Sequence, residues 1–308
     1  MAGRWGFCGG KPDVSRYRGA FAAGPPNRGM LTFVGLGLYD ERSVTLAGRD
    51  AIRGADRVFA EFYTGRLAGA SVADLEASHG VDVEVRDRTG VEEDPDAILE
   101  AAEAGDAVFL SAGDPMVATT HVDLRLRAAE RGIETRVVHG TTAETAAASL
   151  SGLQNYRFGK ATTLPFPWAH GAGAPDVAGG ERTGAGSVPD SVLETVAANR
   201  KRGLHTLVFL DIEDGTGPSY AGPDHEAFLT ADRAAAMLAD HLEGVGVAIA
   251  RAGGPDPLVA ADSLSALAER SFGDPLHLLV LPGDLHVVEY DALVELAGAP
   301  SSALPDPA

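Results

Sequence analysis

The sequence predicts an α/β protein of two domains, with an open, mainly parallel sheet in the first domain and a mixed sheet in the second. Three observations support this prediction. The 308 residues exceed one typical domain and suit two. Over residues 31–138, short apolar runs alternate with amphipathic segments, which is typical of parallel strands joined by crossover helices. The second half again mixes strands and helices, and several of its strands are candidates for antiparallel pairing.

The first domain is expected to span residues 30–140. Its expected strands are short and mostly apolar, and they are Leu31–Gly35, Arg57–Glu61, Asp82–Arg86, Ala107–Leu110 and Ile133–Val138. Its expected helices are Ser43–Ala55, Ser71–His79, Pro95–Ala104 and a fourth that ends at Gly132. Thr119 or Thr120 could cap this fourth helix, because a hydroxyl oxygen accepts from a free N–H of the first turn.

The second domain is expected to span residues 141–300, followed by a tail over residues 301–308. Thr141 and Glu144 have the spacing of a capping box, which predicts a helix start that continues to Leu153. The other expected helices are Ser191–Arg202, Asp232–Leu242, Ser263–Arg270 and Tyr290–Ala297. The expected strands are Ala161–Leu164, His205–Ile212, Gly246–Ala250 and Leu276–Leu281. Residues 170–189 are rich in Gly and Ala and indicate a mobile loop.

The chain is strongly acidic, with 44 Asp and Glu against 25 Lys and Arg and a formal net charge of −19. This surplus argues against nucleic acid as a partner, because neutralising phosphates requires Lys and Arg. The scattered acidic residues favour solvation in a high-salt cytoplasm, and a patch for a basic partner is the alternative. No apolar run approaches the roughly 18–20 residues of a membrane helix, so no membrane association is expected.

Residues 1–29 differ from the rest of the chain. They are basic, rich in Gly and Pro, and show no periodicity. We expect that Met30 is the true start and that residues 1–29 form a disordered or spurious extension. Cys8, the single cysteine, lies in this stretch, so no internal disulfide is possible and a reducing cytoplasm is expected.

The stretch Ala107–Ala128 organises the chain. Its apolar strand meets a turn of small residues, 111–115, in which Asp114 stands between a Gly and a Pro. In an open parallel sheet, ligands bind where a strand end turns into a helix, so this turn predicts one wall of a small-molecule site.

A second glycine-rich loop follows the strand Leu31–Gly35. It resembles a dinucleotide fingerprint, but Asp40 stands where the third Gly of GxGxxG belongs. Asp40 and Glu41 would also repel a pyrophosphate. The loop therefore suits a ligand that has no phosphate or that carries a positive charge.

The sequence lacks the signatures of several other chemistries. It contains no HExxH, no metal-ligand spacing, no GxSxG elbow and no Walker A sequence, so no metal site or nucleophile is expected. His205 and His277 enter apolar strands, where a histidine is more often structural. These absences favour chemistry in which a cofactor brings the reactive group and the protein supplies position.

Seven segments carry a resemblance to a known family. They include GLGLYDERSVTLAG (35–48), FAEFYT (59–64), SAGDPMVATTH (111–121) and RGLHTLVFLDI (202–212), together with residues 250–254, 272–289 and 295–300. These segments closely resemble the archaeal diphthine synthases, which are S-adenosylmethionine-dependent methyltransferases of the tetrapyrrole-methylase superfamily. The resemblance implies the two-domain fold of that superfamily, a cytoplasmic homodimer, and S-adenosylmethionine held in a cleft between the domains.

The resemblance also implies a substrate and a set of site residues. The substrate would be translation elongation factor 2, whose 3-amino-3-carboxypropyl-histidine is methylated on its amine to the trimethylated product, diphthine. Asp114 is expected to hold the cofactor, Ala143 to contribute mainly its backbone, and no general base is assigned. By motif match, the implied cofactor-binding residues are Leu38, Asp114, Val117, Thr142, Ala143, Leu210, Ala252 and His277.

Two alternatives remain open. One is a tetrapyrrole or precorrin methyltransferase that shares the turn around Asp114. The YDER sequence at residues 39–42 counts against it, because those enzymes usually carry Gly-Pro-Gly-Asp there. The other is a non-catalytic binding protein on the same fold.

Overall fold

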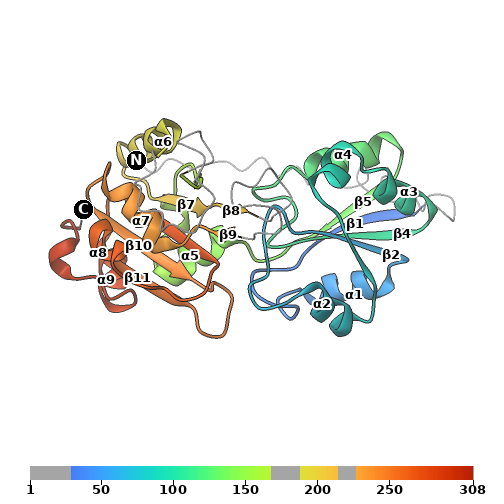
Figure 1. The fold of residues 1–308 in the computed structure, drawn as a ribbon, viewed down its shortest axis with the longest axis horizontal. Coiled ribbons are helices and arrows are strands. Elements are labelled where there is room, and N and C mark those ends of the chain that lie inside the picture. Colours follow the sequence, from blue (N-terminus) through green and yellow to red (C-terminus); the bar gives the residue numbers. More distant parts are fainter. Residues whose placement is uncertain (1–28, 168–187, 214–226, 308) are drawn as a thin grey trace, which may run out of the picture.

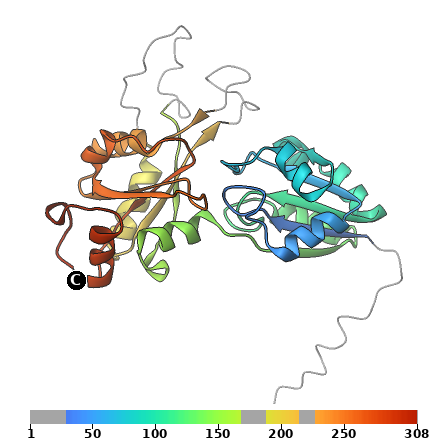
Figure 2. The same cartoon turned by 90° about the horizontal axis from the view of Figure 1, so that it is seen from below.

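The structure, a computed structural model, describes residues 29–167, 188–213 and 227–307. Two lobes lie side by side, one built on strands β1–β5 and the other on strands β6–β12 (Figure 1). The chain passes between them from β5 (Glu134–Val138) to α5 (Ala143–Ser151), as Figure 2 shows from below. The expected N-terminal extension up to residue 28, with Cys8, and most of the expected Gly-rich loop lie outside the described residues.

The first sheet is parallel throughout. Its strands stand in the order β3-β2-β4-β1-β5, which confirms the predicted parallel sheet. The strands before β5 are β1 (Met30–Gly35), β2 (Arg57–Glu61), β3 (Val83–Val85) and β4 (Asp106–Ser111). In the register, Ser111 stands opposite both Gly35 and Glu61, so the carboxyl ends of β1, β2 and β4 meet at one edge.

Helices cover both faces of this sheet. Helices α1 (Leu46–Gly54) and α2 (Val72–His79) pack on one face, and α3 (Asp96–Ala104) and α4 (Val122–Glu130) on the other (Figure 1). Successive residues of the central strands point to opposite faces of the sheet, and both faces are covered by helices. Residues on both faces are therefore buried, which explains why β1 and β4 are apolar almost throughout.

The second sheet is mixed, as predicted, in the order β11-β10-β12-β7-β6, and only β6 and β7 pair in parallel. Its strands are β6 (Thr162–Leu164), β7 (Thr206–Leu210), β10 (Val245–Ala250), β11 (Leu258–Ser263) and β12 (His277–Leu281). A separate antiparallel pair joins β8 (Ile212–Glu213) to β9 (Ala227–Phe228).

Helices also cover both faces of the second sheet. Helices α6 (Asp190–Arg200), α7 (Ala231–Ala239) and α8 (Leu264–Ala268) contribute to one apolar core. Helix α5 and α9 (Val287–Glu295) contribute to a core on the other face. In the part of the chain that the structure describes, no helix has the length and apolar character needed to span a membrane.

Several expected details of the elements are wrong. Neither Thr119 nor Thr120 caps α4: the Thr119 hydroxyl donates to the Pro115 carbonyl, and the Thr120 hydroxyl donates to Glu92 on the π-helical turn η2 (Thr89–Glu93). Strand β11 was not expected, because its sequence LVAADS is less apolar than the strands it joins. Helix α9 begins at Val287, ahead of the expected start, because His286 caps it.

A buried pair of side chains ties the second domain together. His205 Nε2 donates to Glu289 Oε1 at 3.0 Å, and the Gly283 N–H donates to His205 Nδ1 at 3.0 Å. The same carboxylate accepts the backbone N–H groups of Gln154 and His286, each at 2.9 Å. Burial lowers the pKa of His205, so the ring is a neutral Nε2–H tautomer in a structural role.

We expect Glu289→Ala to lower the free energy of unfolding by about 3–5 kcal/mol, because it leaves buried donors without an acceptor. Urea unfolding monitored by circular dichroism measures this loss. Glu295→Ala, at the exposed end of the same helix, is the matched control and should change stability by less than about 0.5 kcal/mol. Equal losses in the two variants would contradict the structural role of the pair.

Candidate functional site

A cavity of about 300 Å³ lies between the two domains. All eight residues that the resemblance implies line it. The first domain contributes three, the start of α5 two, and the second domain three, namely Leu38, Asp114, Val117, Thr142, Ala143, Leu210, Ala252 and His277. The fold therefore brings together residues up to 239 positions apart in the sequence. Their binding of a cofactor stays a prediction.

The wall of the first domain is built from strand ends that approach closely. Gly113 exchanges two backbone hydrogen bonds with Gly37, of 2.6 and 3.2 Å, which joins the turn after β4 to the loop after β1. A Cβ on Gly140, after β5, would lie 2.1 Å from the Gly113 carbonyl oxygen. Only glycine permits this contact, so the three loops are held against one another.

Asp114 extends this contact with its side chain, which is 3% exposed. Its Oδ1 accepts the Met116 N–H at 2.9 Å. Its Oδ2 accepts the Gly140 N–H at 3.2 Å and lies 2.8 Å from Nδ1 of His139. The carboxylate therefore fixes the turn that follows it and links that turn to the segment leading into the second domain.

The start of α5 forms the next part of the wall. The expected capping box at Thr141 and Glu144 is wrong by one residue, since Thr142 is the N-cap and its hydroxyl accepts the Thr145 N–H at 3.2 Å. The N–H groups of Ala143 and Glu144 belong to the first turn, where the helix offers no acceptor. These two donors and the Thr142 cap lie at the cavity.

The second domain contributes the ends of β7, β10 and β12. Leu210 ends β7, Ala252 follows β10, and His277 opens β12. Nδ1 of His277 accepts the Ala231 N–H at 3.1 Å, and Nε2 donates to the Asp274 carbonyl at 3.0 Å. Burial lowers the pKa of His277, so this ring is neutral and both of its nitrogens are engaged by backbone.

Two strained residues also line the cavity. Ala118 has φ 56° and Arg251 has φ 53°, and within the described residues these are the non-glycine residues with positive φ. Such conformations cost about 1–3 kcal/mol each and cluster at functional sites. The Arg251 guanidinium donates to the Phe272 carbonyl at 2.8 Å, which helps to hold the residue in place.

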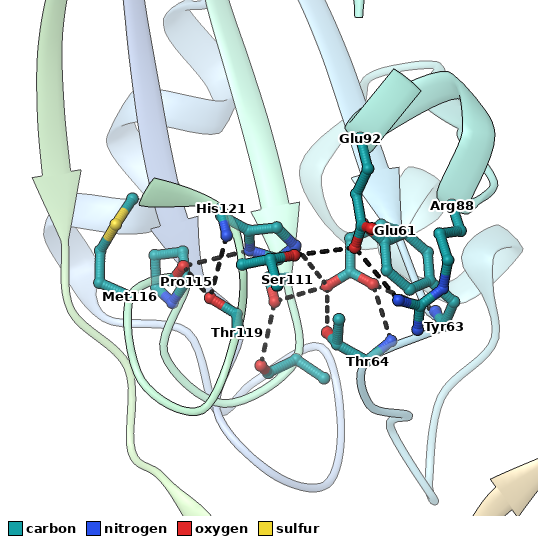
Figure 3. Close-up of polar contacts among 12 residues, drawn as sticks. Glu61, Tyr63, Thr64, Arg88, Glu92, Ser111, Pro115, Met116, Thr119 and His121 are labelled. Atoms are coloured by element: carbon teal, nitrogen blue, oxygen red, sulfur yellow. Dashed lines mark hydrogen bonds and ion pairs between the residues drawn. The ribbon is translucent and has the colours of Figure 1, made fainter. Parts of the chain in front are cut away.

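A buried polar network behind the cavity was missed in the sequence (Figure 3). Glu61, at the carboxyl end of β2, accepts hydrogen bonds from Ser111 at the end of β4 and from Thr64, which lines the cavity. His121, at the start of α4, lies 3.5 Å from the same carboxylate oxygen. The signal available was the position of Glu61 at a strand end inside the quoted motif FAEFYT.

Other lining residues were also missed. Tyr63 and Thr64 follow β2, Arg66 lies in the same loop, and Asp211 follows β7. Each of these residues lies inside, or within three residues of, a segment that resembles the diphthine synthases. The local sequence nevertheless does not distinguish a residue that lines the cavity from its neighbours.

The four buried histidines of the described residues predict a pH dependence of stability. Burial lowers the pKa of His79, His121, His205 and His277 below the value of about 6.5 that they have when unfolded. Below that pH the unfolded chain binds more protons, so the free energy of unfolding should fall as the pH drops from about 7.5 to about 5.5. Urea titrations at constant ionic strength measure the free energy of unfolding at each pH. His205→Gln should reduce the slope of this free energy against pH by the equivalent of up to about one bound proton. A flat profile would contradict neutral burial of these rings.

The comparisons with known proteins agree with this architecture. The family model of the tetrapyrrole (corrin/porphyrin) methylases matches residues 30–268. A diphthine synthase of Natronomonas pharaonis is 71% identical over 278 residues, covering 90% of this chain and 100% of the relative. That of Halobacterium salinarum is 62% identical over 277 residues, covering 89% and 100%. A crystal structure of a diphthine synthase, 34% identical, covers 89% of this chain and 100% of its own with a TM-score of 0.74.

The family model covers the first domain and most of the second, and the alignment with the Natronomonas pharaonis relative covers 90% of this chain. The chain belongs to the tetrapyrrole methylase family and, within it, to the diphthine synthases, which are methyltransferases.

Proposed function

We propose that this chain transfers methyl groups from S-adenosylmethionine to the amine of the 3-amino-3-carboxypropyl-histidine of translation elongation factor 2. The product is the trimethylated residue diphthine, an intermediate of diphthamide biosynthesis. The observation that carries this proposal is the meeting of all eight motif residues at one cavity between the domains. Family membership and the identity to named diphthine synthases support it.

The cavity fits the charges of the proposed cofactor. S-adenosylmethionine carries a sulfonium, an ammonium and a carboxylate but no phosphate. Asp114, Glu144 and Asp211 place carboxylates at the lining, where positive groups are favoured. The N–H groups of Ala143 and Glu144 at the start of α5 suit a carboxylate. A Cβ on Gly113 would meet the Thr141 carbonyl oxygen at 3.9 Å, an ordinary van der Waals contact, and no other atom within 4 Å, so this turn leaves room for a ligand.

The protein's contribution to methyl transfer is alignment. When bound, S-adenosylmethionine supplies an activated methyl group on a cationic sulfur. The walls that Asp114 and Thr142 position would hold the reacting groups in line, and such alignment accounts for a large part of the barrier reduction in displacement reactions. The amine must also present a free lone pair, because a protonated amine has none to donate.

We further propose that the enzyme acts as a homodimer in the cytoplasm. The shared motifs with the diphthine synthases support the dimer. The proposed substrate, a translation factor, supports the compartment. Several apolar side chains stay exposed on the described surface and are available for subunit contact, including Val288 at 59% and Leu296 at 66% exposure on or next to α9.

Incubation with labelled methyl donor tests the reaction. The acceptor is elongation factor 2 purified from a strain that lacks this protein, and mass spectrometry should show up to three methyl groups on the modified histidine. A factor with that histidine replaced is the control and should take no label. Label that appears on a precorrin and not on the factor would instead support a tetrapyrrole methyltransferase.

We expect Asp114→Ala to weaken S-adenosylmethionine binding by about 10–100-fold, because it removes the charged acceptor that holds Met116 and Gly140 in place. Isothermal titration calorimetry measures the Kd. His205→Ala, in the second domain and away from the cavity lining, should leave the Kd within about threefold at a temperature where the variant is folded. Equal or reversed effects would contradict the assignment of the site.

A further inference from the structure

The amine acceptor of the proposed reaction needs a proton acceptor, and three titratable side chains at the cavity, His277, Tyr63 and Asp114, do not provide one. Both ring nitrogens of His277 are bonded to backbone. Burial, with further contributions from Glu61 and Glu92, raises the pKa of Tyr63, so its phenol keeps its proton. The carboxylate of Asp114 already accepts the N–H bonds that hold the wall. A buried carboxylate lies one layer behind this lining.

Glu61 lies in that layer, with no exposed surface. Its Oε2 accepts the N–H groups of Tyr63 at 3.1 Å and Thr64 at 3.0 Å. Its Oε1 accepts the Thr64 hydroxyl at 2.5 Å and the Ser111 hydroxyl at 2.8 Å. All four partners are donors, so the group is a carboxylate that accepts in every bond. Thr64 lines the cavity and connects this carboxylate to it.

His121 approaches the same oxygen of Glu61 that the Thr64 hydroxyl contacts (Figure 3). Its Nδ1 lies 3.1 Å from the Pro115 carbonyl oxygen, which can only accept, so Nδ1 carries the hydrogen of the neutral ring. Its Nε2 lies 3.5 Å from Oε1 of Glu61 and, among the described residues, has no hydrogen-bond partner. Nε2 therefore presents a vacant lone pair to a carboxylate, inside a side chain with no exposed surface.

We propose that Thr64, Glu61 and His121 form a proton relay that deprotonates the acceptor amine, an inference that rests on the proposed methyl transfer to that amine. The N–H bond of the substrate ammonium breaks and its proton goes to Oγ1 of Thr64. The O–H bond of Thr64 breaks and its proton moves to Oε1 of Glu61. From there the proton passes to Nε2 of His121. The result is a neutral amine, an intact Thr64 hydroxyl, and a carboxylate beside an imidazolium.

The charges around His121 favour this transfer. Before it, Glu61 is a buried negative charge, and after it the two groups form an ion pair. Glu92 on η2 also attracts the proton. Arg88, whose guanidinium lies over the Tyr63 ring, pairs with Glu92 and offsets part of the Glu92 charge. Burial lowers the pKa of His121, against Glu61 and the Pro115 carbonyl, which raise it. The ring is therefore neutral and able to accept at neutral pH.

A second cavity of about 250 Å³ lies beside His121, which lines it together with Glu92 and Thr120, although the His121 side chain itself has no exposed surface. Each methyl added to a neutral amine leaves an ammonium, so a second and a third methylation each require another proton to leave. A relay that releases its proton from His121 between transfers resets while the substrate stays bound.

The pH dependence of single-turnover methylation tests the relay. We expect Glu61→Gln and Thr64→Val to lower the rate by about 100-fold at pH 7, in the range of general base catalysis. The loss should shrink towards pH 10, because the amine then arrives already deprotonated. Thr64→Ser keeps the hydroxyl and should stay within about threefold of the wild-type rate. A loss that is equal at every pH would mean a structural role and would overturn the proposal.

Two further variants sharpen the comparison. Glu289→Gln removes the charge of the other buried His–Glu pair, which does not line the cavity, and should show no loss of rate that depends on pH. Glu144→Gln removes a carboxylate that lines the cavity directly. If Glu144→Gln shows the pH-dependent loss and Glu61→Gln does not, the base is Glu144 and the relay is wrong.

Nuclear magnetic resonance of ring nitrogens provides a readout without turnover. In the unliganded wild-type enzyme, His121 should be the Nδ1–H tautomer, its Nε2 should take up the proton on acidification, and Glu61→Gln should lower the pKa of that step. An Nε2–H tautomer would overturn the proposal. If the enzyme binds the methyl donor but transfers no label to elongation factor 2, the proposed function fails, and this measurement still decides whether the pair accepts a proton.

Discussion

Gly113 exchanges two backbone hydrogen bonds with Gly37, and its carbonyl oxygen leaves no space for a side chain on Gly140. This contact sets the position of three loops that belong to neighbouring parallel strands. Asp114 then adds its carboxylate, which binds the N–H of Gly140 and so fixes the start of the passage to α5. A larger residue at Gly140 would separate the loops, and the first-domain wall of the cavity would lose its shape.

The fold was largely predictable because its strands are short apolar runs separated by amphipathic helices. The parallel first sheet and the mixed second sheet follow from that pattern, and the boundaries of β2 and α2 were predicted closely. Strand β11 was not predictable, because it lies at a sheet edge and carries polar residues. The cap of α4 was wrong because Thr119 and Thr120 have partners in tertiary structure that compete with the helix end.

The residues of the candidate site differ in how far the sequence could identify them. Asp114 could be identified from its strand-to-helix turn alone, whereas Leu210 and Ala252 look like ordinary core residues and were identified through the family motifs. Glu61 and His121 are 60 residues apart and carry no local signature, so only the packing of β2 against β4 brings them together. The tautomer of His121, set by the Pro115 carbonyl, is likewise a property of the folded chain.

Within the described residues, the chain passes once from the first domain to the second, between β5 and α5. The cavity therefore lies between two domains that each have their own sheet. A ligand held there is in contact with both lobes and becomes a third component of their interface. Ligand occupancy and the relative position of the lobes would then be thermodynamically linked: whatever favours the position that binds the ligand raises affinity, and the bound ligand favours that position to the same extent. A small molecule bound in this cavity would therefore also connect the two domains.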